Sequence, residues 1–326
     1  MCKQYSVTTI IPIYNVRNYI IRCATTLMEQ TLRDVEYIFV DDATSDNSID
    51  VLEEVIARYP HRKGQVRIVH HAENKGLPAA RNTGLALATG EYIFHCDSDD
   101  YVEPTMLEEM YNAAKEQDAD IVWCDWYLTF AQNERYMKQP SYETPLEALK
   151  AMLSGAMKYN VWNKLVKRSL YVDNNILFPA GYGMGEDLTV IKLFVYADKI
   201  LHLPRAYYHY NKTNSTAFSQ TYSERHLIEL RHNVDDLSNF VLDNLGTGYE
   251  PEIAFLKLEA KFPFLLFPDT EKIKIWKSWY PEANRYIKQN RYITKRNQIL
   301  QQWANKDLWC LVRWYNILFN KLITFR

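Results

Sequence analysis

The sequence predicts an α/β fold with a mostly parallel central sheet flanked by helices, followed by a mainly α-helical C-terminal region. Short β-branched runs alternate with helical patterns between residues 7 and 127. Several of the predicted strands end in acidic side chains. From Tyr222 onward strand signals are sparse and the pattern is helical.

The first predicted strand, Val7–Ile13, is β-branched and typical of a buried strand, and a helical pattern follows at Tyr19–Gln30. Val35–Asp41 is the second strand and ends in the pair Asp41-Asp42. A helix is expected over Asp46–Arg58, with Asp46 or Ser48 as its N-cap, before a third strand at Val66–His71.

The second part of the alternation begins with a helix at Leu77–Ala88, which has Pro78 near its first turn. Glu91–Cys96 is the fourth strand, and Pro104 opens a helix that runs to Gln117. Ile121–Tyr127 is the last strand of this series. In such sheets ligands bind outside the carboxyl ends of the strands, so the acidic strand ends are expected on one rim.

Composition limits the classes of function. The chain has 326 residues, a net charge of −2 and a hydrophobic fraction of 47%, so nucleic acid is not an expected partner. Five scattered cysteines without a CxxC pair suggest neither a disulfide framework nor a zinc site. Without a recognisable signal peptide or membrane span, a cytoplasmic location is expected. The expected domains are residues 1–219, which carry the site, and residues 220–326, which form the helical region.

The run FHCDSDDY crowds Asp97, Asp99 and Asp100 at the end of a predicted strand. Three carboxylates on one rim repel each other unless a cation lies among them, and oxygen ligands of this kind suit Mg²⁺ or Mn²⁺. The alternative is that Asp97 and Ser98 begin a turn and Asp100 caps the next helix. The sequence lacks both the P-loop and the dinucleotide-binding pattern.

Four blocks, VTTIIPIYNV, VEYIFVDDATSDNS, ENKGLPAARNTGL and GEYIFHCDSDDYV, follow one another with a spacing that resembles glycosyltransferase family 2, whose members have the GT-A fold. The resemblance continues more loosely through VWNKLVKRSLY, GMGEDL and YYHYNKTNSTAFS. It implies an inverting, metal-dependent enzyme that uses Mn²⁺ or Mg²⁺. Such an enzyme moves a sugar from a nucleoside-diphosphate donor, here expected to be a UDP-sugar, to a glycan or lipid-linked glycan in surface polysaccharide synthesis.

The resemblance also implies roles for single residues. Tyr14 would stack on the base, unless it is a core tyrosine, and Asp42 would read the base, unless it forms a turn. Arg81 would lie near the base or diphosphate, or else be an exposed helix arginine. In the DxD motif Asp97 would face the ribose and Asp99 would hold the metal, while Asp100 caps the next helix. The expected nucleotide-sugar site comprises Pro12, Tyr14, Asn15, Asp42, Lys75, Arg81, Asp97 and Ser98.

The Glu186-Asp187 pair is the expected source of the catalytic base. Three glycines precede it in GYGMGED, which suggests a loop that approaches a substrate closely. A sugar hydroxyl needs a proton acceptor as it attacks, and the resemblance assigns that role to Asp187. Glu186 would bind the acceptor or orient Asp187. The alternative for Asp187 is an ordinary N-cap of a helix over Leu188–Ala197.

Two further assignments are carried by the looser blocks. Trp162, Asn163 and Lys164 would line the acceptor side, or Trp162 would belong to a helix core. His209 would be a second metal ligand, or a structural histidine; relatives often have YYYR where this chain has YYHYN.

The C-terminal segment Asp307–Phe325 is rich in aliphatic and aromatic residues, with a narrow polar stripe at Arg313, Asn316, Asn320 and Thr324. Such a helix suits a membrane interface, which would place the protein peripherally at the cytoplasmic face of the inner membrane. The alternative is a helix docked on the catalytic domain or in a homodimer interface.

A sugar nucleotidyltransferase and a non-catalytic scaffold are the two alternative classes of protein. A sugar nucleotidyltransferase of the GT-A fold would carry a glycine- and lysine-rich loop after the first strand, and IPIYNVRN has neither feature. A non-catalytic scaffold that binds nucleotide or glycan would show an eroded DxD or ED motif, and both motifs are intact.

Overall fold

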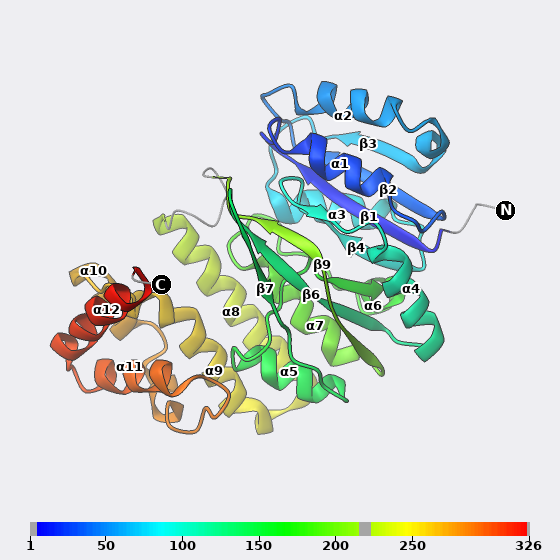
Figure 1. The fold of residues 1–326 in the computed structure, drawn as a ribbon. Coiled ribbons are helices and arrows are strands. Elements are labelled where there is room, and N and C mark those ends of the chain that lie inside the picture. Colours follow the sequence, from blue (N-terminus) through cyan, green and yellow to red (C-terminus); the bar gives the residue numbers. More distant parts are fainter. Residues whose placement is uncertain (1–4, 215–222, 325–326) are drawn as a thin grey trace. The chain divides into compact units, whose positions relative to one another are not determined.

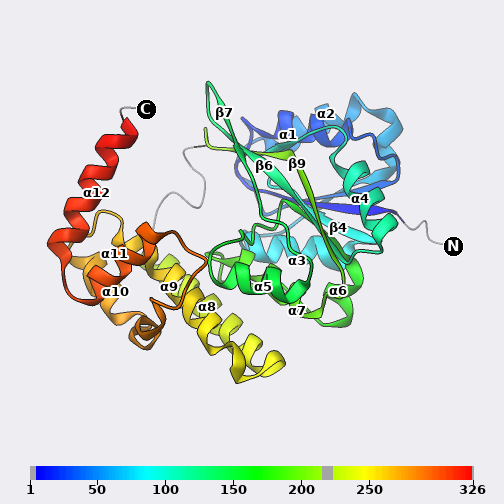
Figure 2. The same ribbon diagram turned by 60° about the horizontal axis from the view of Figure 1, so that its bottom comes forward.

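The computed structural model describes residues 5–214 and 223–324. The chain divides into two compact units, residues 1–148 with 159–233 and residues 149–158 with 234–326. The first unit extends beyond the expected boundary at residue 219, because one continuous helix, α8, runs from Glu224 to Leu245. Figures 1 and 2 show the elements in two views.

A nine-stranded sheet forms the centre of the first unit, with the order β3-β2-β1-β4-β8-β6-β9-β5 and β7 paired to β6. Six strands run in one direction, and β5, β7 and β8 run opposite to them. The strands are β1 Val7–Ile13, β2 Val35–Asp41, β3 Val66–His70, β4 Tyr92–His95, β5 Tyr101–Val102, β6 Ile121–Thr129, β7 Glu134–Met137, β8 Lys164–Lys167 and β9 Ile200–Asn211.

The helices of the first unit cover both faces of this sheet (Figure 2). One face packs on α1 and α4, where the Tyr37 hydroxyl donates to the Leu27 carbonyl and Tyr92 meets Tyr111 edge to face. The other face packs on α3, where a Cβ on Gly84 would lie 2.4 Å from Ile10 Cγ2, so glycine permits the close approach. The predicted layers of an α/β fold are therefore confirmed.

The α-helices of both units have the following bounds: α1 Ile20–Met28, α2 Ser48–Ala57, α3 Leu77–Leu87, α4 Met106–Gln117, α5 Pro145–Leu153, α6 Arg168–Asp173, α7 Thr189–Tyr196, α8 Glu224–Leu245, α9 Glu250–Lys261, α10 Thr270–Ser278, α11 Lys295–Asn305 and α12 Trp309–Thr324.

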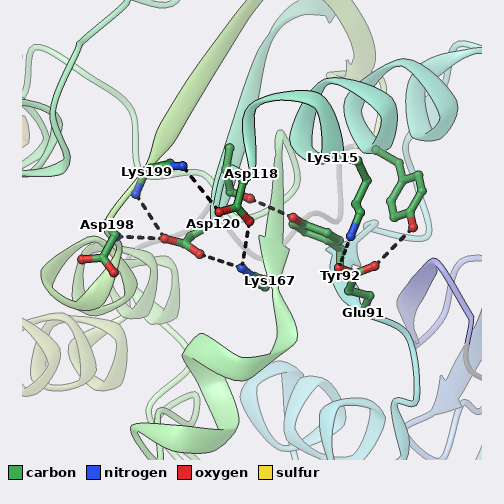
Figure 3. Close-up of polar contacts among 10 residues, drawn as sticks. Glu91, Tyr92, Lys115, Asp118, Asp120, Lys167, Asp198 and Lys199 are labelled. Carbon is green, nitrogen blue, oxygen red and sulfur yellow. Dashed lines mark hydrogen bonds and ion pairs between the residues drawn. The ribbon is translucent and has the colours of Figure 1, made fainter.

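Charged side chains at the amino ends of the parallel strands pair with one another (Figure 3). Lys167 lies 3.2 Å from Asp120 and 3.6 Å from Asp118, and Lys199 lies 3.4 Å from Asp118. Asp120 also accepts from the backbone amides of Asp198 and Lys199, at 2.9 and 3.1 Å. The charges at the amino ends of the strands are therefore paired within the protein. A ligand is expected instead at the carboxyl ends of the strands.

The second unit is helical, as predicted, and is built around aromatic side chains and one buried lysine. The Lys261 ammonium donates to the Trp279 carbonyl at 2.9 Å and to Asn284 Oδ1 at 2.6 Å, and it lies 4.3 Å from the Trp276 ring. Burial lowers the pKa of Lys261 to about 8. Among the helices within residues 5–214 and 223–324, none is long and apolar enough to cross a membrane.

Candidate active site

The loops after β1 and β2 are tied together by Asn15. Its backbone has a φ of 54°, a left-handed conformation that asparagine tolerates better than most residues. The Asn15 carboxamide oxygen accepts from the Ser45 amide at 3.1 Å and from the Ser45 hydroxyl at 3.0 Å. Next to it Tyr14 is 49% exposed, so it is not a core tyrosine, whereas Pro12 is buried within β1. An open aromatic ring at the carboxyl end of β1 suits stacking on a base.

Asp42 is buried and its carboxylate holds the loop before α3. It accepts from the amides of Lys75 and Gly76, both at 2.8 Å, and Oδ1 lies 2.7 Å from His71 Nδ1. The Lys75 side chain itself is exposed. Asp42 thus shapes the loop that carries Lys75, a role that the sequence did not suggest.

The DxD turn follows β4, with the Asp100 amide donating to the Asp97 carbonyl at 3.1 Å. Ser98 is buried in this turn, and Asn214 donates to Asp99 Oδ2 at 2.7 Å. Burial, and then the charge of Asp97, raise the pKa of Asp99. The ionised form of Asp99 is therefore destabilised in this turn, and a bound cation would stabilise it.

Asp100 does not cap the next helix, contrary to the prediction. Its buried carboxylate accepts from the Tyr208 hydroxyl and from the Asn211 amide, both at 2.7 Å, while α4 starts after Thr105 without a side-chain cap. Asp100 therefore fixes the DxD turn to β9, a strand more than 100 residues later in the sequence.

An aromatic stack supports the DxD turn. The Trp162 ring lies 4.5 Å from Tyr208, 5.3 Å from Tyr210 and 4.8 Å from Trp126. The Tyr208 hydroxyl in turn accepts from the Asp97 amide at 3.1 Å. Trp162 lies in a turn before β8 rather than in a helix, and it is 5% exposed, so it supports the DxD turn through Tyr208.

Asn163 and Lys164 are also buried. The Asn163 side chain donates to the Cys124 carbonyl at 2.8 Å, and the Lys164 ammonium donates to the Asn160 carbonyl at 2.7 Å. Burial lowers the pKa of Lys164 to about 7, and Asp187 acts in the opposite direction. Lys164 is therefore a buried residue whose charge interacts with Asp187, the expected base.

Arg81 joins the two acidic motifs. Its guanidinium is 1% exposed, and Nη2 lies 2.9 Å from Asp97 Oδ1 and 3.7 Å from Glu186 Oε1. Arg81 is thus not an exposed helix residue; it holds the DxD turn and the ED pair in one site, although the sequence separates them by about ninety residues. Its Nε and Nη1 groups have no hydrogen-bond partner among the residues described.

The Glu186-Asp187 pair forms a single 3₁₀ turn, Glu186–Leu188, ahead of α7. Burial, and then the charge of Asp187, raise the pKa of Glu186. Burial likewise raises the pKa of Asp187, although Arg81 opposes the shift. Asp187 Oδ1 lacks a hydrogen-bond partner within the described part of the chain, so it is not an N-cap acceptor there and is free to take a proton.

The glycine-rich loop before this pair is held by α8, which sequence reasoning missed. Asn233 Nδ2 donates to the carbonyls of Tyr182 and Met184, at 3.0 and 2.9 Å. The Met184 amide donates to Glu229 Oε2 at 3.0 Å. Gly185 has a φ of 86°, which favours glycine. The three anchors fix the backbone directly before Glu186.

Replacing Asn233 with alanine is expected to lower kcat by about tenfold, because a base displaced by a fraction of an ångström transfers protons poorly. Binding of UDP should stay within about twofold, since the DxD turn is untouched. Steady-state kinetics and calorimetric titration check this, with Asp243→Ala, an exposed change on the same helix, as the matched control. An unchanged kcat in Asn233→Ala would mean that the loop does not need this anchor.

His209 has both ring nitrogens engaged by carboxylates. Nε2 lies 2.8 Å from Glu103 Oε1 and Nδ1 lies 2.8 Å from Glu134 Oε1. The ring also stacks on Tyr101 and Tyr127, at 4.2 and 4.8 Å. With no ring nitrogen left for a metal, the geometry favours the structural alternative for His209.

The DxD turn offers oxygen ligands of the kind that Mg²⁺ and Mn²⁺ prefer. Within the described residues no group of three or more His, Cys, Asp or Glu side chains is arranged around a common metal position. Asp99 with Asp97 fits instead a cation that takes one or two carboxylates and completes its shell with phosphate oxygens and water.

Comparison with known proteins identifies the family of the chain. Residues 8–183 match the family profile described as glycosyl transferase family 2. The uncharacterized glycosyltransferase EpsJ of Bacillus subtilis is 33% identical over 215 residues, which are 63% of this chain and 61% of that protein. The cholesterol galactosyltransferase of Borreliella burgdorferi is 32% identical over 220 residues, 63% of this chain and 60% of that protein. The match thus spans about three fifths of the length of these two relatives.

Solved structures extend the likeness to nearly the whole chain. Residues 1–349 of TarS from S. aureus in complex with UDP superimpose with a TM-score of 0.69 and 20% sequence identity, covering 97% of this chain and 91% of that one. This likeness shows the fold, and the family profile covers more than half of the sequence. The chain therefore belongs to glycosyltransferase family 2 and has the GT-A fold with a helical C-terminal region.

Proposed function

We propose that this glycosyltransferase moves a sugar from a UDP-sugar to a hydroxyl group of a glycan or lipid-linked glycan, with inversion at the anomeric carbon and with a divalent cation. The product would be part of a bacterial surface polysaccharide. The TarS structures with UDP and UDP-GlcNAc support a uridine donor. A mannosyltransferase of Pyrobaculum calidifontis, solved with GDP-Man and Mn²⁺ and superimposing with a TM-score of 0.52, supports a divalent cation.

The observation that carries this proposal is the buried Arg81 between Asp97 and Glu186, at 2.9 and 3.7 Å. One guanidinium fixes the distance between the motif expected to hold the donor and the pair expected to supply the base. A binding module would need only the donor motif. An arrangement that couples both motifs favours catalysis, because transfer needs donor and proton acceptor in one geometry.

The chemistry follows from these positions. An acceptor hydroxyl oxygen forms a bond to the anomeric carbon while the bond from that carbon to the diphosphate oxygen breaks on the opposite face, and the hydroxyl proton passes to Asp187. In this proposal Tyr14 stacks on the uracil, and Arg81 holds Asp97, the residue expected to face the ribose. A divalent cation at Asp99 would supply positive charge to the leaving diphosphate.

We assign the acceptor side to the surface around the glycine-rich loop. Tyr182 is 36% exposed, and its ring stacks on His232 with 3.7 Å between the ring centroids. An exposed aromatic ring suits packing on a sugar ring. Trp162, Asn163 and Lys164 would act from beneath, by supporting the DxD turn and by neighbouring Asp187.

The proposal is tested by a panel of UDP- and GDP-sugars, measured by thermal shift with and without Mn²⁺ and then by release of the nucleoside diphosphate. A donor bound by the folded state raises the melting temperature. We expect UDP-sugars to stabilise the protein in the presence of Mn²⁺ and one of them to be turned over. Stabilisation by donors without any turnover, with extracted lipid-linked glycans present, would indicate a scaffold instead.

A further inference from the structure

In the last helix, α12, Arg313 and Asn316 of the polar stripe face the protein, and several large apolar side chains are exposed. Asn316 is 3% exposed, and its Nδ2 donates to the Leu265 carbonyl at 2.8 Å. Arg313 Nε donates to the Pro268 carbonyl at 3.1 Å. The side chains on the opposite arc are large, apolar and exposed: Leu311 40%, Trp314 58%, Ile317 56% and Leu318 43%. The helix is therefore docked by these polar residues together with Val312, which is fully buried, and it leaves a second, apolar side exposed.

The loop on which α12 docks also exposes large apolar side chains. Leu266 and Phe267 are 36% and 51% exposed and lie directly between Leu265 and Pro268, which accept the hydrogen bonds from α12. Leu311, Trp314, Ile317 and Leu318 form one exposed apolar strip along α12, and such a strip marks a contact with a partner or a lipid surface.

The charge of the surrounding segment identifies the kind of partner. Residues 261–326 contain thirteen Lys and Arg against four Asp and Glu, whereas residues 1–260 contain 25 Lys and Arg against 36 Asp and Glu. Basic groups border the apolar surface directly, since the Lys272 ammonium lies 3.4 Å from the carbonyls of both Leu266 and Phe267. A strongly basic segment repels a second copy of itself and is attracted to an anionic surface.

We propose that Leu266, Phe267 and the exposed arc of α12 (Leu311, Trp314, Ile317 and Leu318), here called the apolar arc, dock the protein on an anionic lipid bilayer. The apolar side chains enter the boundary between headgroups and acyl chains, and Lys272 and Arg313 lie at headgroup depth. The inference goes beyond the proposed transfer reaction and does not depend on it, because the second unit carries the apolar arc by itself. Such docking would bring the chain to acceptors that are themselves anchored in the bilayer.

The test is co-sedimentation of the full chain with phosphatidylcholine vesicles, with and without phosphatidylglycerol, at low and high salt. We expect binding to the anionic vesicles that weakens with salt, and at least about tenfold weaker binding for the double variant Trp314→Ser, Ile317→Ser. Leu177→Ser, at an apolar residue that is 60% exposed in the first unit, is the matched control and should bind like the wild type.

A second variant guards against misfolding of the first. Phe267→Asn changes a loop residue with a φ of 51°, which asparagine tolerates, and it should also weaken vesicle binding. Wild-type protein that stays in solution with anionic vesicles at low salt would overturn the proposal. A concentration-dependent dimer in sedimentation velocity that the double variant abolishes would overturn it too, because the apolar arc would then be a self-interface.

Discussion

Asp187→Asn is expected to lower kcat by about 10²-fold or more, because the amide keeps the shape of the side chain and loses the proton acceptor. Binding of UDP with Mn²⁺ should stay within about twofold, since no hydrogen bond or ion pair among the described residues joins Asp187 to the DxD turn. Turnover assays and calorimetric titration on the same preparation separate the two effects. Near-normal turnover would show that another group is the base.

The pH profile of the wild type provides the control for this expectation. Burial raises the pKa of Asp187 to about 6, so the deprotonated, reactive form is lost as the pH falls below that value. The rate kcat should therefore fall about tenfold per pH unit below pH 6 and level off above it, and the profile should be absent from the residual activity of Asp187→Asn. A wild-type rate that is flat between pH 4.5 and 7, as an approximate window, would contradict a carboxylate base.

Asp99→Ala is expected to abolish the stimulation of UDP binding by Mn²⁺ and to weaken binding in Mn²⁺ by about tenfold or more, because the cation loses its protein ligand. Calorimetric titration of UDP with and without Mn²⁺, for wild type and variant, gives four affinities. Asp173→Ala, an exposed carboxylate at the end of α6, controls for the loss of one negative charge. Four equal affinities would sink the assignment of a cation to Asp99.

The strands that were predicted correctly are those whose own residues form a clear β-branched pattern. Val7–Ile13 and Val35–Asp41 match β1 and β2 to the residue, because β-branched runs buried on both faces need no partner to be recognised. β9, Ile200–Asn211, was not predicted, since its sequence ILHLPRAYYHYN mixes proline, arginine and histidine with apolar residues. Its strand character depends on pairing with β6 and on the bulges near Asp125.

The same difference holds for the site: short motifs can be recognised in the sequence, whereas contacts between distant residues cannot. The DxD and ED motifs are readable because their chemistry is contained in a few consecutive residues. The residues that hold these motifs in place cannot be recognised from the sequence. Asn233 and Glu229 look like ordinary polar residues of a helix, and only the structure shows that they bind the glycine-rich loop. Asp100 was assigned to a helix cap because the nearest helix in sequence was the natural partner, whereas Tyr208 comes from β9.

The orientation of the last helix was also beyond the sequence. The stripe containing Arg313 and Asn316 predicts the hydrophilic side of an amphipathic helix, which normally faces solvent. In the second unit the backbone carbonyls of Leu265 and Pro268 accept hydrogen bonds from Asn316 and Arg313 of this stripe. These polar residues are therefore used for docking together with the buried Val312, and the apolar arc is left exposed.

The central claim, that one site built around Arg81 catalyses transfer with Asp187 as base, is tested most directly by the configuration of the first product. The α-linked UDP-sugar selected by the donor panel is hydrolysed with water as acceptor, and the anomeric proton of the released sugar is followed by NMR before mutarotation. The account predicts that the β-anomer forms first and that Asp187→Asn abolishes its formation. Release of the α-anomer first would contradict a single displacement and the role assigned to Asp187.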